Sequence, residues 1–242
     1  MRISETNAIF CRPVAHRGIW GGDIEEYSIS AYQNAIDNGY PIEIDLYSTT
    51  DGEIVCFHDK TLKRMTGKDG FVYEKTFAEL KSYSLNGTAE KIPAFSEVLS
   101  LCENKTPLLI EFKNQPNNDY VEKAVDMLKN YKGEFAVQSF NPKIINKIKK
   151  LAPEFIRGVL ATNDLEDTKS ENPFTRFVLK KMPLNFIIKP DFISYKYTGL
   201  PLPKRKTKNK AGVCWTVTSQ SLFDKVKPFT DNIIFENFIP KL

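Results

Sequence analysis

The sequence predicts an α/β fold, a TIM (β/α)8 barrel, from three observations. Eight short apolar runs typical of strands recur along the chain, and segments of helical periodicity separate most of them. This alternation is the pattern of parallel strands joined by helices, and eight repeats favour closure into a barrel. Ionisable residues also gather at the ends of several runs, as at the catalytic face of a barrel. The length of 242 residues fits one barrel or two small domains, so the repeats decide between them.

The expected elements follow one another in a regular order. The strands span residues 13–15, 42–46, 108–112, 135–137, 156–160, 192–194, 213–217 and 233–235, and the clearest helices span 28–38, 118–131, 142–151 and 219–226. After the second strand the alternation breaks, because residues 53–57 have the pattern of an extra strand and residues 67–93 are rich in Gly, Lys, Thr and Ser. We interpret about 47–105 as a small insertion after the second barrel strand, too short and polar to bury much core, within a single domain of residues 1–242.

Composition limits the classes of function. The 41% hydrophobic and 26% charged residues are those of an ordinary soluble globular protein. A net charge of +4 slightly favours an anionic ligand but is too small for a dedicated nucleic-acid binder, so no nucleic-acid partner is expected. No apolar run approaches a membrane span or a signal sequence, so we expect no stable membrane insertion and a cytoplasmic location. Nothing in the sequence indicates an oligomeric state.

Two further features have unremarkable interpretations. Cys11, Cys56, Cys102 and Cys214 are scattered without the spacing of a zinc site, and we expect them to be small buried hydrophobes. Residues 204–210, KRKTKNK, form a basic stretch that we interpret as a solvated loop, with contact to an anionic surface as the alternative.

Ionisable residues end or follow four of the apolar runs. They are His16 and Arg17 after the first strand, Glu43 and Asp45 in the second, His58 and Asp59 after the extra strand, and Glu111 and Lys113 in the next barrel strand. Because the carboxyl ends of barrel strands meet at one face, we expect these side chains to lie together.

Glu43 and Asp45 indicate a cation site. They are two residues apart, so a strand points both to the side opposite Ile42 and Ile44. Two carboxylates on a half-buried surface repel each other unless a cation or a shared proton compensates, and oxygen ligands suit Mg²⁺ or Ca²⁺. Glu111, from another strand, would supply a third carboxylate. The alternative, a solvated strand paired with surface lysines, is disfavoured by the flanking isoleucines.

Cationic residues beside these carboxylates suit a phosphate ligand. Glu111 and Lys113 share one face of their strand, either as a plain ion pair or, with a cation on the carboxylate, leaving Lys113 to meet a phosphate oxygen. Arg17 offers a planar donor fork matched to phosphate, and Gly18 lets the backbone turn tightly beside it.

His16 and His58 are the only two histidines of the chain, and each lies at a strand end beside a charged neighbour. One such histidine is often a hydrogen-bonded core residue, whereas two at the same face are harder to explain in that way. Across a metal-held phosphate they would provide one general acid and one general base near neutral pH, as cleavage of a phosphodiester requires.

Together these residues resemble the glycerophosphodiester phosphodiesterase family. The motifs that carry the resemblance are HRG at 16–18, a Glu and a small hydroxyl residue at Glu26 and Ser28, EID at 43–45, HD at 58–59, EFK at 111–113, QSF at 138–140 and WTV at 215–217. They occur in the family's order over nearly the whole chain, and the family's insertion after the second barrel strand is also present. Any single tripeptide is weak evidence, but the ordered set is specific.

The resemblance implies a TIM barrel that hydrolyses glycerophosphodiesters to glycerol 3-phosphate and an alcohol. It implies a divalent cation on Glu43, Asp45 and Glu111, with His16 and His58 as the acid and base. It further implies that Arg17 and Lys113 hold the phosphate. The assignment of acid and base stays open here, as does the choice between a cyclic phosphate and direct attack by water.

Two residues depart from the family's pattern. Tyr27 stands where Asn is usual before the small hydroxyl residue, and Thr218 stands where Asn usually follows WTV. Both departures affect the expected substrate contacts more than catalysis. Trp215 is predicted either to pack on the glycerol or head group or to be part of the barrel packing.

Two other functions compete with this prediction. A phospholipase of the C or D type would act on lipids or lysolipids from the same barrel, and the basic stretch 204–210 is the feature that favours it. A catalytically inactive module that binds a phosphodiester is the other, but the expected acid, base and metal positions are all occupied by chemically competent residues.

Overall fold

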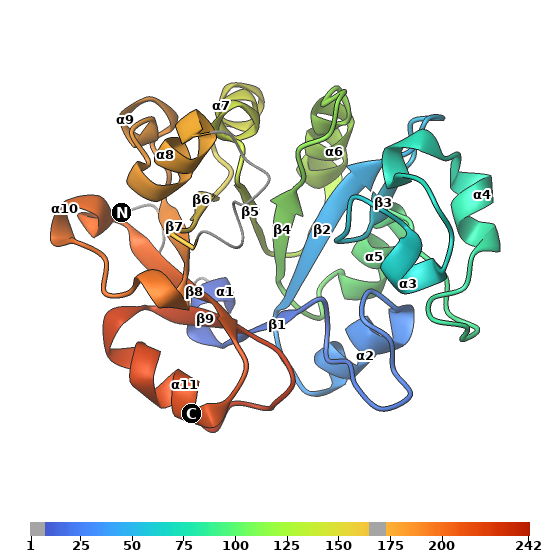
Figure 1. The fold of residues 1–242 in the computed structure, drawn as a ribbon, viewed down its shortest axis with the longest axis horizontal. Coiled ribbons are helices and arrows are strands. Elements are labelled where there is room, and N and C mark those ends of the chain that lie inside the picture. Colours follow the sequence, from blue (N-terminus) through green and yellow to red (C-terminus); the bar gives the residue numbers. More distant parts are fainter. Residues whose placement is uncertain (1–7, 165–172) are drawn as a thin grey trace.

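Eight parallel strands close into a barrel in the computed structural model, which describes residues 8–164 and 173–242 (Figure 1). The strands are β1 (Val14–His16), β2 (Ile42–Ser48), β4 (Leu108–Phe112), β5 (Phe135–Ser139), β6 (Arg157–Ala161), β7 (Phe192–Lys196), β8 (Ala211–Val217) and β9 (Asn232–Phe235). They are hydrogen-bonded in the order β1-β9-β8-β7-β6-β5-β4-β2, and pairing of β1 with β2 closes the ring. The predicted barrel and its eight strands are confirmed, with small shifts at the strand ends.

Helices connect most of the strands and surround them (Figure 1). They are α1 (Ala8–Cys11), α2 (Ile29–Asp37), α3 (Lys63–Thr66), α4 (Phe77–Ser82), α5 (Phe95–Cys102), α6 (Tyr120–Asn130), α7 (Pro142–Leu151), α8 (Pro173–Lys181), α9 (Asn185–Ile188), α10 (Lys204–Thr207) and α11 (Gln220–Val226), with the 3-10 turns η1 (Val72–Glu74), η2 (Tyr197–Gly199) and η3 (Lys227–Phe229). The four helices expected from periodicity are confirmed as α2, α6, α7 and α11. Local signals fix their starts: the Ser28 hydroxyl accepts a hydrogen bond from the Ala31 amide at 3.0 Å, and Pro142 begins α7.

The barrel strands alternate between two apolar environments. Residues such as Ile44 and Ile110 point outward and join the main core between the strands and the helices. Residues such as Val14, Leu109 and Ala136 belong to a separate buried cluster, together with Ile9 of α1. Side chains on one face of a strand recur every two residues. A residue two positions after a member of this second cluster therefore points to the same face of its strand.

The segment between β2 and β4 differs from the expectation of a polar insertion with little core. Strand β3 (Ile54–Cys56) pairs antiparallel with β2, as expected for the extra strand. However, the segment has a buried cluster of its own, which includes Phe57, Leu62, Met65 and Leu80. Apolar residues spaced among many polar ones supply this cluster, so overall polarity was a poor guide to burial.

Two smaller expectations were wrong. Cys56, Cys102 and Cys214 are buried as predicted, but Cys11 is exposed at the end of the short helix α1. The basic stretch interpreted as a loop contains the helical turn α10, which begins at Lys204. Among the residues described, none of the helices is both long and apolar enough to cross a membrane.

Candidate active site

Strand pairing brings the predicted site residues of β1, β2 and β4 side by side. His16 is the register partner of Glu43, and Asp45 is the partner of Glu111. Glu111 in turn pairs with Gln138 of β5. These side chains all point to the inner face of their strands. Parallel pairing in this register therefore places the polar side chains of neighbouring strands next to one another.

A cavity of about 100 Å³ lies among these side chains. Its lining consists of His16, Arg17, Glu43, His58, Glu111, Lys113, Gln138, Phe140, Leu160, Trp215, Thr216 and Ile234. The predicted histidines, both predicted phosphate-binding residues and Trp215 therefore border one space. Asp45 is not part of the lining but is completely buried beside it.

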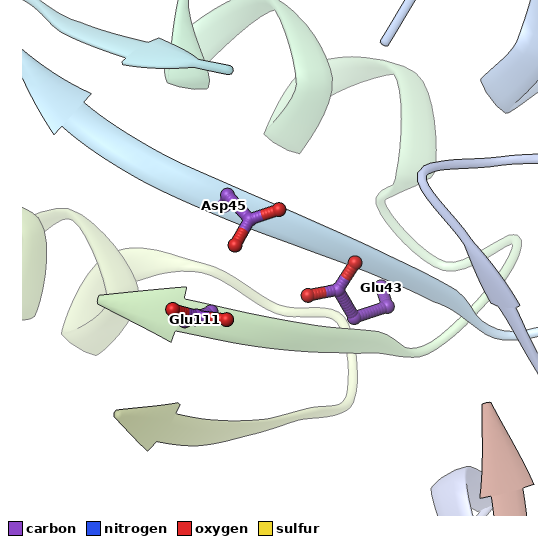
Figure 2. Close-up of side chains that lie close together, drawn as sticks. All are labelled: Glu43, Asp45 and Glu111. Atoms are coloured by element: carbon purple, nitrogen blue, oxygen red, sulfur yellow. The ribbon is translucent and has the colours of Figure 1, made fainter. Parts of the chain in front are cut away.

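Glu43, Asp45 and Glu111 converge as the sequence led us to expect (Figure 2). One oxygen from each carboxylate can be chosen so that the three lie within 4.8 Å of one another, and all three residues are buried. Among the described residues, the buried Glu43 Oε2 atom has no hydrogen-bond partner. An all-oxygen donor set with an unsatisfied buried acceptor fits a hard divalent cation such as Mg²⁺ or Ca²⁺.

Lys113 forms ion pairs with two carboxylates of this cluster. Of the two roles expected from the sequence, this is the plain ion pair. Its Nζ lies 2.6 Å from Asp45 Oδ1 and 2.9 Å from Glu111 Oε1. Burial alone would raise the pKa of Asp45, but the positive charges of Lys113, His58 and Arg17 lower it to about 2. For Glu111, burial outweighs Lys113 and raises the pKa well above its usual range, with the charges of Asp45 and Glu43 adding to the effect. The nearby positive charges therefore favour the ionised form of Asp45 but do not offset the burial of Glu111.

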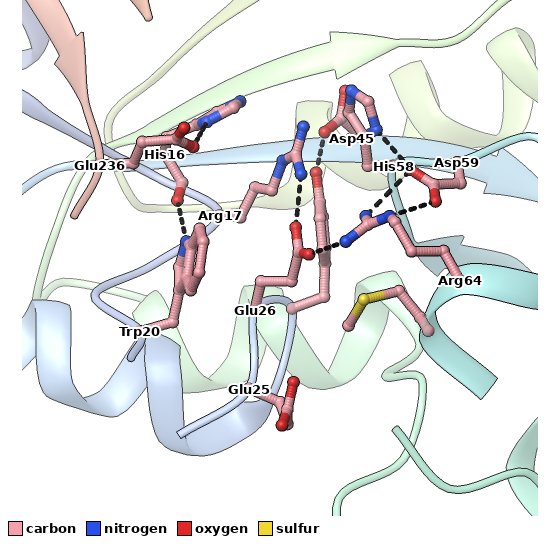
Figure 3. Close-up of polar contacts among 12 residues, drawn as sticks. His16, Arg17, Trp20, Glu25, Glu26, Asp45, His58, Asp59, Arg64 and Glu236 are labelled. Atoms are coloured by element: carbon pink, nitrogen blue, oxygen red, sulfur yellow. Dashed lines mark hydrogen bonds and ion pairs between the residues drawn. The ribbon is translucent and has the colours of Figure 1, made fainter. Parts of the chain in front are cut away.

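Glu236 is a site residue that the sequence analysis did not identify. It follows β9, and its Oε2 lies 2.6 Å from His16 Nδ1 (Figure 3). The other ring nitrogen, His16 Nε2, lies 3.9 Å from Glu43 Oε2. Burial raises the pKa of Glu236, but the hydrogen bond with His16 and nearby positive charges lower it overall. Glu236 follows a short apolar strand just as His16 does, and this position was the signal available in the sequence.

His58 also lines the cavity and is also held by a carboxylate. Its Nδ1 is 2.8 Å from Asp59 Oδ1, and the two histidine rings are 6.5 Å apart between centroids. Burial lowers the pKa of His58 to about 4, and the charge of Lys113 acts in the same direction, whereas Asp59 and Asp45 oppose it. His58 is therefore neutral near pH 7 in this arrangement.

A chain of ion pairs connects His58 with Arg17 (Figure 3). Asp59 accepts from Arg64 Nε at 2.6 Å, Arg64 also pairs with Glu26, and Glu26 pairs with Arg17. Arg64, on α3, was not predicted, because it comes from the segment after β3 and has no motif of its own. This series of ion pairs fixes the position of the Arg17 guanidinium beside the cavity.

The turn after β1 explains the HRG motif. Arg17 and Gly18 both have positive φ, at 63° and 86°. A Cβ at Gly18 would lie 2.7 Å from the backbone of Ala31, so only glycine allows the turn to approach α2 so closely.

Tyr27 contacts the acidic cluster and does not line the cavity. Its ring is completely buried, its φ is 62°, and its hydroxyl donates a hydrogen bond to Asp45 Oδ2. The expectation that this departure affects mainly substrate contacts is therefore incomplete. Thr218, the other departure, is exposed just after β8.

Aromatic rings form one wall of the cavity. Trp215 packs edge-to-face on Phe140, with 5.6 Å between ring centroids. The buried Trp215 Nε1 atom has no hydrogen-bond partner in the part of the chain that the structure describes. Trp215 is thus a packing residue that also lines the cavity.

Comparison with known proteins gives a consistent result. Residues 16–238 match the glycerophosphoryl diester phosphodiesterase family. The protein YhdW of Bacillus subtilis is 28% identical over 94% of this chain and 96% of its own length. A glycerophosphodiester phosphodiesterase of Caldanaerobacter subterraneus is 33% identical over 61% of this chain and 65% of that protein. The crystal structure of an Oleispira antarctica phosphodiesterase in complex with the product sn-glycerol-3-phosphate is similar in fold, with a TM-score of 0.75 and 22% identity over 93% of this chain and 92% of that one.

Replacement of Tyr27 by Phe tests the buried contact with Asp45. The variant leaves the Asp45 oxygen without its donor, so we expect the free energy of unfolding to fall by about 1–3 kcal/mol in urea. We also expect Mg²⁺ or Ca²⁺ to bind roughly tenfold or more weakly by calorimetry, because groups that orient metal ligands tune affinity. Tyr197→Phe, at a partly exposed position, is the matched control and should change neither quantity. Unchanged stability and affinity in Tyr27→Phe would show that the contact is dispensable.

The lowered pKa of His58 can be measured directly by NMR. In a His16→Gln variant the single remaining imidazole should titrate near pH 4 in the presence of chelator, and Lys113→Met should raise this midpoint. Because the folded-state pKa lies below the ordinary value of about 6.5, the neutral ring stabilises the fold fully above pH 6.5. This contribution is lost as the pH falls through about 4. A midpoint near 6.5 in both proteins would contradict the environment described for His58.

Proposed function

Because the chain belongs to the glycerophosphoryl diester phosphodiesterase family, and is an enzyme of that activity, we propose a specific reaction and mechanism for it. The enzyme hydrolyses glycerophosphodiesters to glycerol 3-phosphate and an alcohol, depends on a divalent cation, and uses His16 and His58 as acid and base. The observation that carries the proposal is the position of the buried carboxylate cluster beside a cavity bordered by both histidines.

Glu43, Asp45 and Glu111 would hold the cation, since they are the carboxylates that converge and since Glu43 Oε2 accepts no hydrogen bond from any described residue. When bound, Mg²⁺ or Ca²⁺ would neutralise charge on the phosphate and polarise its phosphorus–oxygen bonds. A cation there would also weaken the hold of the carboxylates on Lys113 and leave its ammonium group to a phosphate oxygen, as Coulomb attraction is shared among the available charges.

Arg17 is the second proposed phosphate ligand. It borders the cavity, and its pairing with Glu26 fixes the guanidinium without removing its positive charge. A planar fork held in one orientation suits phosphate better than a mobile side chain, because less side-chain entropy is lost on binding. Trp215 is proposed to contact the glycerol or head group through its ring face or its indole N–H.

The environments of the two histidines favour different roles. His58 is neutral near pH 7, so it can accept the proton of the attacking hydroxyl, whether this belongs to the substrate's glycerol or to water. His16 donates its proton to the leaving alcohol, and the Glu236 carboxylate at its Nδ1 stabilises the charged ring before that transfer. Both rings line the cavity with their centroids 6.5 Å apart, so one can serve the entering group and the other the leaving group.

A small-molecule glycerophosphodiester is the proposed substrate. This is consistent with the glycerol 3-phosphate product held by the Oleispira antarctica enzyme, which shares the fold. The cytoplasmic location expected from the sequence stays a prediction.

Metal removal tests the role of the carboxylate cluster. We expect the purified protein to release glycerol 3-phosphate from glycerophosphocholine or glycerophosphoethanolamine, to lose this activity in EDTA, and to recover it with Mg²⁺ or Ca²⁺. Glu43→Gln should need more metal for half-maximal activity, because it removes one charged ligand. Full activity in chelator would contradict the proposed metal dependence, and no activity with any metal would contradict the proposed substrate.

The roles of the histidines can be separated with a leaving group that needs no proton. His16→Ala should lower kcat for glycerophosphocholine by roughly 10² or more, but much less for the p-nitrophenyl ester of glycerol phosphate. His58→Ala should impair both substrates to a similar extent, because each still needs a base. If His58→Ala spares the p-nitrophenyl ester instead, the two roles are exchanged. Lys63→Ala, at an exposed lysine, is the control.

A further inference from the structure

Helices α8, α9 and α10 carry an unusual surface, which we call the apolar–basic patch. It consists of Phe174, Phe177, Phe186 and Ile187 together with Lys180, Lys181, Lys206 and Lys210. The side chains of Phe174 and Phe186 are 74% and 75% exposed, the highest values among the exposed large hydrophobic residues of the described chain. In Figure 1, α8 and α9 lie side by side with α10 nearby.

The apolar side chains of this patch are not part of the hydrophobic core. Helix α8 buries Leu179 on its inner side, and α9 buries Ile188. The phenylalanines belong to the opposite, outer side of these two short helices. Large apolar groups grouped on a surface are unfavourable in water and indicate contact with another apolar phase.

The charges of the patch have a single sign. Residues 173–189 contain four basic and no acidic residues, and residues 200–211 contain five basic and no acidic residues, in a chain with 34 basic and 30 acidic residues altogether. Lys206 donates to the Lys180 carbonyl oxygen at 2.7 Å, which joins α10 to α8. The positive potential is therefore concentrated next to the exposed rings.

A groove runs between the three helices. Its volume is about 530 Å³, and it is lined by Phe177, Lys181, Met182, Asn185, Phe186, Lys206 and Lys210. Apolar side chains and lysines thus share one depression, a combination that matches an amphiphile with an anionic head group.

A second cavity shares lining residues with the patch and with the catalytic cavity. Phe174 and Leu179 border this second cavity of about 690 Å³, together with Asn114, Asn141 and Phe140. Phe140 also borders the catalytic cavity. Phe140 is thus shared by the linings of the two cavities, and Phe174 belongs both to the second cavity and to the patch.

We propose that the apolar–basic patch docks the enzyme on an anionic phospholipid surface, with the phenylalanines in the interfacial layer and the lysines at the head groups. Protruding aromatic residues flanked by lysines are typical of helices that lie at a membrane interface. Lysine is depleted at protein–protein interfaces, where arginine is preferred, so the lysines favour a lipid surface over a protein partner. The proposal concerns where the enzyme acts and does not depend on its substrate.

Vesicle flotation tests the proposal. In metal-free buffer of low ionic strength, the full chain should float with vesicles of phosphatidylcholine and phosphatidylglycerol in equal amounts, should bind them less as salt is added, and should ignore pure phosphatidylcholine. The double variant Phe174→Ser/Phe186→Ser should bind at least about tenfold more weakly. Lys181→Glu/Lys210→Glu should lose binding by a similar factor.

Matched controls lie on α11 and η3, outside the patch. Phe229→Ser changes a ring that is 53% exposed, and Lys225→Glu/Lys227→Glu reverses two lysines. Both should bind the mixed vesicles like the wild type. All patch variants should hydrolyse soluble glycerophosphocholine at the wild-type rate, which shows that they fold and separates this test from the proposed reaction.

Three outcomes would overturn the proposal. One is wild-type protein that stays unbound to the mixed vesicles at low salt. Another is an equal loss of binding in the control variants, which would indicate general charge or hydrophobicity. The last is a wild-type dimer in analytical ultracentrifugation that Phe174→Ser/Phe186→Ser converts to monomer while vesicle binding is absent, which would assign the patch to self-association.

Discussion

The central constraint on this structure is the burial of three carboxylates at one end of the barrel. Glu43, Asp45 and Glu111 repel one another where little water is present, and the positive charges of nearby side chains offset part of this repulsion. Lys113 bridges two of them, and Arg17 contributes at longer range while it is held by Glu26. The pKa of Asp45 falls and that of Glu111 rises, which shows that the balance is uneven. An all-oxygen cluster of this kind fits a bound divalent ion.

Along the inner face of the barrel strands, apolar residues are followed by the polar residues of the site. Val14 and Leu109 fill an apolar cluster, and two residues later His16 and Glu111 face the cavity. The apolar cluster gives the strands a packed base, and it prevents the polar ends from shifting in register, because a slip by one residue would turn every side chain to the opposite face. Rigidity of the site therefore comes from the packing beneath it.

Carboxylates beyond the acidic cluster give the two histidines unequal surroundings. Glu236 holds His16 from the end of β9, while Asp59 holds His58 within a network that continues through Arg64 to Glu26. Tyr27 occupies the space between this network and the acidic cluster, and its hydroxyl meets Asp45. The residues that hold the histidines and Asp45 in place thus owe their roles to contacts with residues distant in sequence.

The sequence by itself determined the order of strands, the barrel and the position of the charged residues at strand ends, because these follow from local periodicity and from the common direction of parallel strands. It also determined the convergence of Glu43, Asp45 and Glu111 once that barrel was assumed. Only the tertiary structure decided the pairing of His16 with Glu236, which is 220 residues away, and of Glu26 with Arg64. The buried cluster between β2 and β4 and the exposed rings of α8 and α9 were decided in the same way. Such contacts join elements whose spacing in sequence has no periodicity, so their geometry exists only after the chain has packed.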